Sequence, residues 1–360
     1  MSTLLAQRLH NHRLAGTDLR TPAEVVAWLG AVQAQDFAGA KWSLGLRLKN
    51  AREADIARDF DEGAILRTHV MRPTWHFVAP ADIRWLIELT APRVHTINGT
   101  MYRKLGLESA LLARSLDIMA RALEGGNYLT RGELAGALAQ VGIPAEGIRL
   151  GYIVHYGELE AVLCSGPRRG KQFTYALLSE RAPNAQSLPR DEALAELARR
   201  FFTSHGPAMI EDFAWWSGLT RADARQAVSM VRPALRHVEV DEREYWFALS
   251  DEAPLGEGPD AIILPFFDEY TIAYKEHSVF VAAELADQTS TMLLGGSVVL
   301  DGQVAGSWRR TLGRGAISIE IAPLRPFTDA EHAALEHAAV RFGEFHELPV
   351  SLRESAAARG

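Results

Sequence analysis

Apolar residues recur at helical spacing between residues 22 and 32, where Val25 and Leu29 fall on one face of a predicted helix. Thr21 is suited to cap the start of this helix, and Pro22 to occupy its first position. The same kind of pattern returns along most of the chain. It is interrupted by short alternating segments that are typical of strands.

The first predicted unit covers residues 1–105. Its expected elements are helices over 3–9, 22–32 and 53–61, strands over 64–68 and 74–78 around a turn at residues 71–73, and a helix from Asp82 to about Pro92. Three helices closed by a β-hairpin predict a winged helix-turn-helix.

A second unit of the same kind is predicted over residues 106–180, with helices over 110–124, 130–140 and 147–163. Thr130 and Glu133 form a capping-box pattern at the start of the middle helix. The hairpin that follows, over 163–178, has a basic, glycine-rich tip containing Arg168, Arg169 and Lys171. Such a tip is suited to phosphate contact, although a solvated hairpin tip is the alternative.

After a linker at 179–190, a third winged helix is predicted over residues 187–252. Its expected elements are helices over 192–205, 209–217 and 220–231 and a hairpin of strands 238–240 and 245–249. Residues 258–353 then carry short strands with glycine turns, at 261–265, 271–274, 291–300, 303–310 and 316–322. We predict a small β-barrel or a curled sheet, a closing helix over 328–344 and a disordered tail over 354–360. The fold class expected is α+β.

Composition describes an ordinary soluble protein of 360 residues, with no apolar run of about 18 residues and no secretory signal at the start. The single cysteine, Cys164, excludes an internal disulfide and indicates a reducing cytoplasm. The formal charge is −7, and residues 201–360 alone carry −11, so the first half of the chain is weakly basic. That half is able to face phosphates. We expect a cytoplasmic, nucleoid-associated monomer.

The candidate chemistry begins with two glutamines, Gln33 and Gln35, at the end of the helix that starts at Pro22. Two amides one residue apart in extended backbone aim at nearly the same point, and each offers donors and an acceptor. Such a pair is able to hold a water molecule. The alternative is a pair of capping or solvated residues.

The hairpin at residues 67–76 is the second informative stretch, with His69, Arg72, Thr74, Trp75 and His76 as candidate DNA contacts. An arginine at a tight turn beside a tryptophan is able to enter a groove and stack on a base. The alternative is a structural hairpin in which Trp75 fills the core and Arg72 is solvated. The residues alone favour neither interpretation. A separate stretch contains two neighbouring carboxylates, Asp268 and Glu269. We expect this pair to have a structural role rather than to act as an acid or a base.

Several kinds of chemistry are disfavoured by missing motifs. No histidine pair has metal-ligand spacing, and no phosphate-binding loop, dinucleotide-binding fingerprint or nucleophile elbow occurs. We therefore expect neither a metal nor a cofactor.

The stretch from Gln33 to Arg47 contains Gln-Ala-Gln and then Ala-Lys-Trp-Ser-Leu-Gly-Leu-Arg. It resembles the signature of the AlkZ-like winged-helix DNA glycosylases, the AlkZ and YcaQ family. Residues 68–76, 82–92, 264–270 and 302–310 resemble the wider family pattern. A glutamine at the third motif position resembles the AlkZ branch rather than the YcaQ branch.

The resemblance implies three tandem winged helices and a β-barrel that cup duplex DNA. It also implies excision of bulky N7-alkylated purines, in some members from interstrand crosslinks made by self-toxic natural products. Gln33 and Gln35 would be the catalytic pair, and Arg309 and Arg310 further DNA contacts. An N7-alkylated purine is already a cationic leaving group, so two neutral amides that position water at C1′ suffice.

Two neighbours of the pair have open roles. Asp36 either orients one amide or acts as the base. Lys41 is able in principle to form a Schiff base, although a phosphate-binding or structural role is favoured. Two alternative functions remain. One is a non-catalytic winged-helix DNA binder or regulator, and the other is a protein-interaction module.

Overall fold

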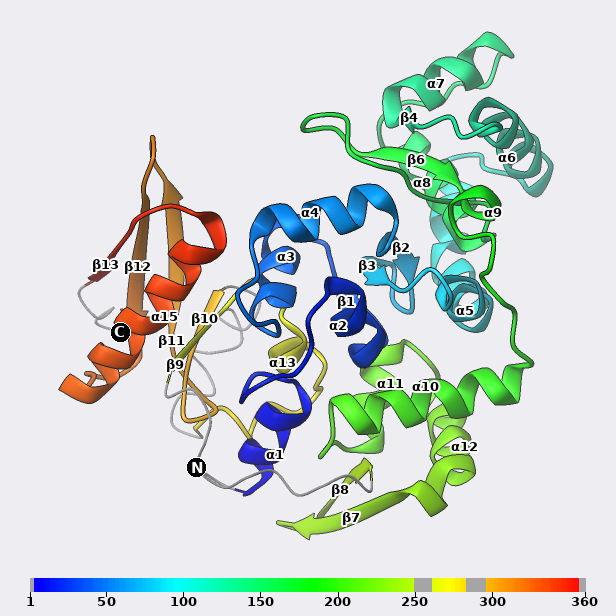
Figure 1. The fold of residues 1–360 in the computed structure, drawn as a ribbon. Helices are drawn as coiled ribbons and strands as arrows, with labels where there is room; N and C mark the ends of the chain where they lie inside the picture. Colours follow the sequence, from blue (N-terminus) through cyan, green and yellow to red (C-terminus); the bar gives the residue numbers. More distant parts are fainter. Residues whose placement is uncertain (1–2, 249–260, 283–295, 356–360) are drawn as a thin grey trace.

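The computed structural model describes residues 3–248, 261–282 and 296–355 and has a mixed α+β fold (Figure 1). Four groups of elements follow one another along the chain, and the last group packs back against the first. No helix within these described ranges is both long and apolar enough to cross a bilayer.

The first group contains a three-stranded sheet with the strand order β1-β3-β2. Its elements are α1 (Thr3–Asn11), α2 (Pro22–Leu29), β1 (Val32–Gln33), α3 (Phe37–Gly45), α4 (Glu53–Glu62), β2 (Leu66–Val70), β3 (Thr74–Val78) and α5 (Ile83–Lys104). Thr21 and Glu24 cap α2 reciprocally, and Gly30 ends it at a φ of 82°. Because the helix stops there, residues 32 and 33 are free to pair with β3, and the prediction of a helix to residue 32 is wrong.

Two further expectations for this group are corrected. Residues 37–45 form helix α3, which the sequence pattern did not predict. Helix α5 does not end near Pro92 but continues to Lys104 with the proline inside it. Proline removes one helical hydrogen bond. Here the helix beyond Pro92 buries Val94 and Asn98, and tertiary packing outweighs the local cost.

The second group has its own apolar core, formed by residues such as Met119, Leu134 and Ile153. Its elements are α6 (Ser109–Leu123), β4 (Leu129–Thr130), α7 (Arg131–Gln140), α8 (Gly147–Leu159), β5 (Leu163–Ser165), β6 (Thr174–Leu177) and α9 (Leu178–Arg181). The capping box of Thr130 and Glu133 is confirmed. Helix α8 ends four residues before the predicted end because Leu163 belongs to β5, and α9 occupies the first part of the predicted linker.

The third group follows the predicted order of three helices and a hairpin. Its elements are α10 (Arg190–Ser204), α11 (Ile210–Ser217), α12 (Arg221–Val231), the short 3₁₀ helix η1 (Arg232–Ala234), β7 (Leu235–Val240) and β8 (Arg243–Ala248). Thr220 caps α12 through the backbone N–H of Asp223.

The fourth group is a five-stranded sheet in the order β13-β12-β11-β10-β9. Its elements are β9 (Ala261–Leu264), α13 (Glu269–Ile272), β10 (Gly296–Leu300), β11 (Gln303–Leu312), β12 (Ile317–Pro323), α15 (Asp329–His346) and β13 (Val350–Glu354). Within the described residues β9 and β13 are unpaired at opposite edges, so these strands form an open sheet. The expected closed barrel is not found there.

Two smaller expectations in this group also change. Residues 269–272, at the predicted strand 271–274, form helix α13, because Asp268 caps its N-terminus by accepting the N–H of Tyr270 at 2.9 Å. The start of the predicted disordered tail is strand β13, which pairs in parallel with β12. Residues 291–295 and 356–360 of the predicted strand and tail lie outside the described residues.

The fourth group packs on the first through α3. The indole of Trp42 donates to the carbonyl oxygen of Ile263 at 2.8 Å and contacts the rings of Phe342 and Phe345. Arg47 forms a buried, two-pronged ion pair with Asp268, with contacts of 2.8 and 2.9 Å. The predicted structural role of Asp268 is confirmed by this pair. The contact brings α13 directly beneath β1.

Candidate functional site

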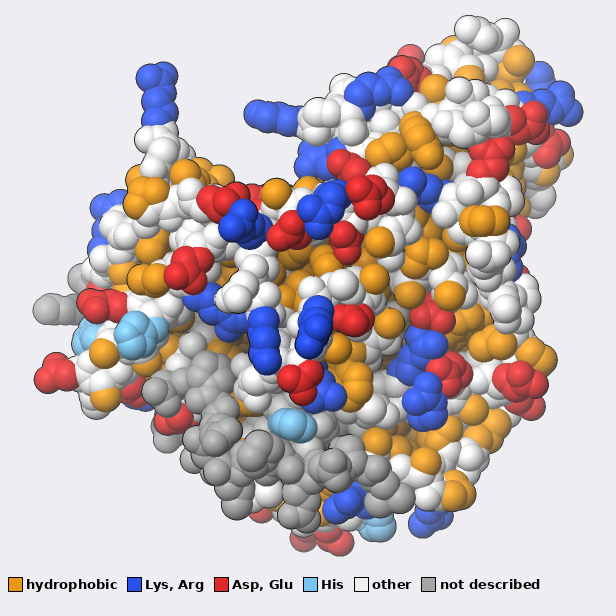
Figure 2. Space-filling model, viewed as in Figure 1, with side chains coloured by type: hydrophobic (Ala, Val, Ile, Leu, Met, Phe, Trp, Pro, Cys, Tyr) orange, Lys and Arg blue, Asp and Glu red, His pale blue; other side chains and the backbone are white. Residues whose placement is uncertain are grey.

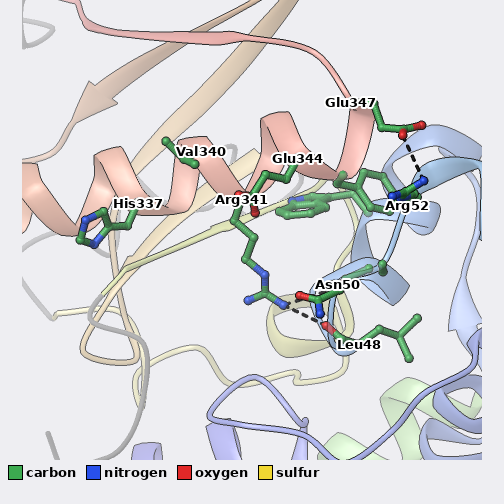
Figure 3. A pocket seen from close by; sticks show the side chains of 12 residues that line it. Leu48, Asn50, Arg52, His337, Val340, Arg341, Glu344 and Glu347 are labelled. Carbon is green, nitrogen blue, oxygen red and sulfur yellow. Dashed lines mark hydrogen bonds and ion pairs between the residues drawn. The ribbon is translucent and has the colours of Figure 1, made fainter.

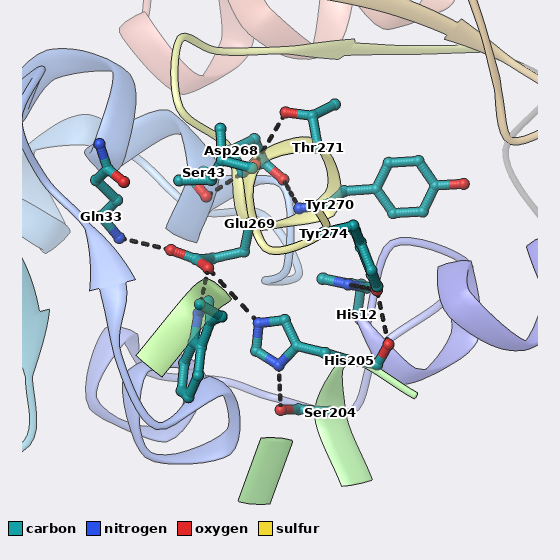
Figure 4. Close-up of polar contacts among 12 residues, drawn as sticks. His12, Gln33, Ser43, Ser204, His205, Asp268, Glu269, Tyr270, Thr271 and Tyr274 are labelled. Atoms are coloured by element: carbon teal, nitrogen blue, oxygen red, sulfur yellow. Dashed lines mark hydrogen bonds and ion pairs between the residues drawn. The ribbon is translucent and has the colours of Figure 1, made fainter. Parts of the chain in front are cut away.

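Gln33 is held at both its backbone and its side chain. Its backbone N–H donates to Glu269 Oε1 at 2.7 Å (Figure 4), and its side-chain Oε1 accepts from Arg72 Nη2 at 3.0 Å. Only 7% of the residue is exposed. The amide therefore has a fixed orientation in which one lone pair of Oε1 is already occupied.

Gln35 differs because its side chain is exposed. Gln33 pairs with His76 of β3, and the next residue, Ala34, donates its N–H to the carbonyl oxygen of Trp75 at 2.7 Å. The Oε1 atom of Gln35 then lies 3.4 Å from the N–H of Trp75, a long hydrogen bond. Both amides thus lie along β3, one fixed and buried and one open to solvent.

Glu269 lies behind Gln33 and is completely buried. Its second oxygen, Oε2, accepts from the indole N–H of Trp216 at 2.9 Å and lies 3.6 Å from His205 Nε2. Burial raises the pKa of Glu269, but the nearby His205, the charge of His76 and the hydrogen bond from the N–H of Gln33 outweigh it and leave the pKa below its ordinary value. A buried carboxylate therefore stands directly behind the backbone of Gln33.

The buried polar cluster continues away from the glutamines. Tyr274 Oη donates to the carbonyl oxygen of His205 at 2.6 Å and lies 2.7 Å from His12 Nε2 (Figure 4). The cluster joins the segments that directly follow α1, α10 and α13. It fixes the position of Glu269 from the side opposite Gln33.

The two neighbours of the pair have structural partners. Asp36 caps helix α3 by accepting the N–H of Ala38 at 3.2 Å. Lys41 is buried and forms an ion pair with Glu53, which also contacts His346 Nδ1 at 2.8 Å. Lys41 therefore joins α3 to α4 and α15, and its amine is not open to a reacting sugar.

The hairpin residues divide into buried and accessible ones. His76 is completely buried, and burial followed by the charge of Arg72 lowers its pKa to about 4. His69 is also buried and contacts Glu158, whereas Thr74 and Trp75 are partly exposed. Arg72 is partly exposed, and its guanidinium lies 5.5 Å from the ring of Trp215.

The loop between β5 and β6 contacts the segment that follows the glutamines through Arg168, near the start of the loop. The guanidinium of Arg168 lies over the rings of Phe37 and Phe173, at 5.2 and 4.8 Å. Arg169 forms an ion pair with Glu133 at 2.7 Å. Lys171 is exposed and has no acidic partner among the residues that the structure describes.

Basic side chains also lie on the C-terminal sheet. Arg309 is exposed but pairs with Glu320 at 2.8 Å, and Arg310 lies over the ring of Phe342 at 5.4 Å. The turn between β11 and β12 carries an exposed Arg314. Figure 2 shows Lys and Arg side chains at the ends of this turn and of the β5–β6 loop, on either side of a hollow.

Sequence reasoning missed three residues of this region. Glu269 was assigned no contact with Gln33, and no pattern in the sequence links the two. Arg67 lies over the Trp75 ring at 4.2 Å and donates to the carbonyl oxygen of Ala34 at 3.0 Å. Arg314 follows a glycine in the predicted turn between strands 303–310 and 316–322. Its position at the tip of a turn could have indicated a DNA contact.

A cavity of about 620 Å³ lies elsewhere, between α15 and the loop after α3 (Figure 3). Arg341 crosses it and donates to the carbonyl oxygen of Leu46 at 2.7 Å. None of its lining residues belongs to β1, β2 or β3. In the described part of the chain no three His, Cys, Asp or Glu side chains are grouped to hold a metal ion.

Comparisons with known proteins agree with this architecture. The family model described as "DNA glycosylase AlkZ-like" matches residues 26–345. The chain belongs to the AlkZ-like DNA glycosylase family. The expected family and the expected class of enzyme, a DNA N-glycosylase and therefore a hydrolase, are confirmed at this level.

Two relatives come from Streptomyces sahachiroi. A protein named "Interstrand DNA cross-link repair glycosylase" is 26% identical over 322 residues, which cover 85% of this chain and 86% of the relative. The solved structure of S. sahachiroi DNA glycosylase AlkZ has a TM-score of 0.82 and 23% identity, and the match covers 98% of each chain. At that identity the structural likeness shows the fold.

Proposed function

We propose that this protein is a monofunctional, cofactor-independent glycosylase that releases bulky N7-alkylated purines from duplex DNA by attack of water at C1′. The observation that carries the proposal is the arrangement of Gln33, on β1, and Gln35, just after it, beside β3. One amide is fixed by Arg72 at 3.0 Å, and the other projects into solvent where a substrate has access. A fixed group beside an accessible one is suited to orienting a water molecule.

The chemistry requires little acid catalysis. Alkylation at N7 makes the purine cationic, so the departing base needs no added proton, and positive charge develops on the sugar. Amide oxygens stabilise that charge and accept a hydrogen bond from the attacking water. Gln35 is the residue with a free amide for the water, and Gln33 provides the fixed second contact.

The neighbouring residues have supporting roles in this proposal. Asp36 holds the start of α3 and thereby sets the position of Gln35, since its carboxylate already accepts a backbone N–H. Lys41 stabilises the packing of α3 through Glu53. A Schiff base at Lys41 is not part of the mechanism, which is why we propose hydrolysis without strand cleavage.

For DNA binding we propose that the three helical groups are winged helices and that residues 1–105, 106–180, 187–252 and 258–353 are the four domains. Lys171, Arg169 and the paired Arg309 would contact phosphates, and Arg72, Thr74 and Trp75 would face the lesion. His69, His76, Arg168 and Arg310 would support these contacts from buried or stacked positions. We retain the proposal of a cytoplasmic, nucleoid-associated monomer.

The test is base release from a duplex that carries a single N7-methylguanine, followed by conversion of abasic sites to strand breaks with alkali. We expect release from the damaged strand and none from an undamaged duplex of the same sequence. Strand breaks without alkali would contradict a monofunctional enzyme. Because a relative is named for interstrand cross-link repair, a duplex with an N7–N7 guanine crosslink is the second substrate, for which we expect separation of the strands.

A further inference from the structure

Helix α11 belongs to the third group of elements, and none of the proposed catalytic residues lies on it. Its last turn, residues 215–218, nevertheless contacts both groups that hold Gln33. The indole N–H of Trp216 donates to Glu269 Oε2 at 2.9 Å, and the other oxygen of Glu269 accepts the backbone N–H of Gln33 at 2.7 Å. The first contact therefore acts on the backbone of Gln33 through one intermediate residue.

The second contact acts on the side chain of Gln33 through Arg72. The Arg72 guanidinium lies 5.5 Å from the centre of the Trp215 ring and donates to Gln33 Oε1 at 3.0 Å. The ring is itself held, because its indole N–H donates to the carbonyl oxygen of Ile272 at 3.0 Å. An aromatic ring in a fixed position attracts a guanidinium and limits the positions that it takes.

Gly218 brings the end of α11 against the hairpin turn that carries Arg72. It has a φ of 70°, and a Cβ at this position would lie 2.7 Å from the carbonyl oxygen of Met71 and 3.4 Å from Cγ of Arg72. That carbonyl oxygen is not free to move away, because the Met71 side chain is buried and its backbone N–H donates to Thr90 Oγ1 at 3.0 Å. Glycine therefore allows an approach of helix and turn that a side chain would prevent.

We propose that the last turn of α11 is a positioning element that aligns Gln33 with the reacting sugar. One contact acts on the backbone of this glutamine, and the two others act on its side chain through Arg72. Because a misplacement of about 1 Å costs up to about 100-fold in rate, the third group of elements contributes to the reaction without supplying a catalytic residue. The inference rests on the proposed glycosylase function and adds to it the element that sets the geometry of Gln33.

The main variant is Gly218→Ala, which places a methyl group against the Met71 carbonyl oxygen. Gly142→Ala is the matched control, because Gly142 follows helix α7 with a φ of 76° and an added Cβ there lies in open space. Both variants carry similar backbone strain, and only the first moves the turn. We expect Gly218→Ala to lower the single-turnover rate of release from N7-methylguanine DNA at least about 10-fold at unchanged DNA affinity, and Gly142→Ala to keep the wild-type rate.

A double-mutant cycle separates positioning from a general loss of stability. Arg72→Lys already removes the contact with Gln33 Oε1, so adding Gly218→Ala to that variant should lower the rate no further. A reduction by the same factor in both backgrounds would show that Gly218 acts on stability alone and would overturn the inference.

Trp215→Leu keeps the inference testable if Gly218→Ala does not fold. The Trp215 side chain is 48% exposed, so its truncation spares the core while it removes the ring beside Arg72. Trp28→Leu is the control, since the Trp28 ring lies 3.9 Å from the guanidinium of Arg13, and its indole N–H also donates to a backbone carbonyl oxygen, at the end of α1. We expect a lower kcat with unchanged KM for Trp215→Leu alone. A raised KM with unchanged kcat would show that Trp215 binds DNA and would overturn its positioning role.

The position of Gln33 is also measurable without base release. In protein labelled with ¹⁵N-glutamine, the side-chain NH₂ signal of Gln33 is assigned by its absence from the Gln33→Ala variant. We expect this signal to shift in Gly218→Ala and to stay in place in Gly142→Ala. An unshifted signal in Gly218→Ala would overturn the inference whether or not the enzyme is active. A shifted signal in a protein whose wild type releases no base would refute the proposed function and leave α11 as the element that positions Gln33.

Discussion

The carboxylate of Glu269 accepts the backbone N–H of Gln33 at 2.7 Å, although the two residues are 236 positions apart in the sequence. One residue comes from the first group of elements and the other from the C-terminal group. The candidate catalytic pair is therefore held in place by a part of the chain that carries none of the proposed catalytic residues. The C-terminal group is needed for the geometry of the site.

We expect Glu269→Gln to lower the free energy of unfolding by about 1–3 kcal/mol. The NH₂ group of the new glutamine must face the N–H of either Gln33 or Trp216, so one buried donor is left unpaired. Base release should fall with it, since Gln33 loses its fixed position. Urea unfolding and single-turnover release measure the two effects. Glu276→Gln, on the same segment but only partly buried, is the control, and equal behaviour of the two variants would contradict the role of Glu269.

Arg72→Lys separates a positioning role from a phosphate contact. The guanidinium holds Gln33 Oε1 at 3.0 Å, and a lysine keeps the charge but is not able to reproduce that geometry. We expect kcat to fall at least about 10-fold, which corresponds to about 1.4 kcal/mol of transition-state stabilisation, with KM nearly unchanged. A raised KM with unchanged kcat would instead indicate that Arg72 binds the DNA backbone.

Lys41→Gln tests whether the lysine is structural. The ion pair of the buried Lys41 with the partly exposed Glu53 predicts a lower melting temperature and retained base release. Borohydride should trap no covalent complex between the wild type and N7-methylguanine DNA. A trapped complex that disappears in the Lys41→Gln variant would show a Schiff base and contradict the hydrolytic mechanism.

The buried His76 predicts a loss of stability in mild acid. Its folded pKa of about 4 lies below the ordinary value of 6.5, so the unfolded chain binds more protons between these pH values. The contribution to the free energy of unfolding is fully present above pH 6.5 and is lost as the pH falls toward 4, by about 3 kcal/mol for this residue. Urea unfolding between pH 7 and 4 measures the slope, which should be smaller in His76→Gln. Equal slopes would show that His76 is protonated in the folded state.

Local patterns in the sequence predicted what local physics determines. The predicted caps at Thr21 and Thr130 mark helix starts in the structure, because side-chain oxygens and backbone N–H groups three residues apart meet without help from the rest of the fold. The candidate pair Gln33 and Gln35 could likewise be recognised from a short stretch of sequence, because both glutamines lie within three residues of each other.

Contacts between distant segments could not be predicted in this way. Helix α5 continues through Pro92 because residues beyond it are buried, and the open C-terminal sheet depends on where β13 returns. Lys41 resembled a candidate for chemistry until Glu53 and His346 were seen beside it. The partner of Gln33 could not be predicted either, because nothing in the sequence around Gln33 indicates a contact with a carboxylate 236 residues away.

The most direct test of the central claim compares the wild type with Gln33→Ala and Gln35→Ala in base release from a duplex containing one N7-methylguanine. We expect each variant to retain its fold and its affinity for DNA while the single-turnover rate falls at least about 10-fold. Release by both variants at the wild-type rate would contradict the assignment of the glutamines as the catalytic pair.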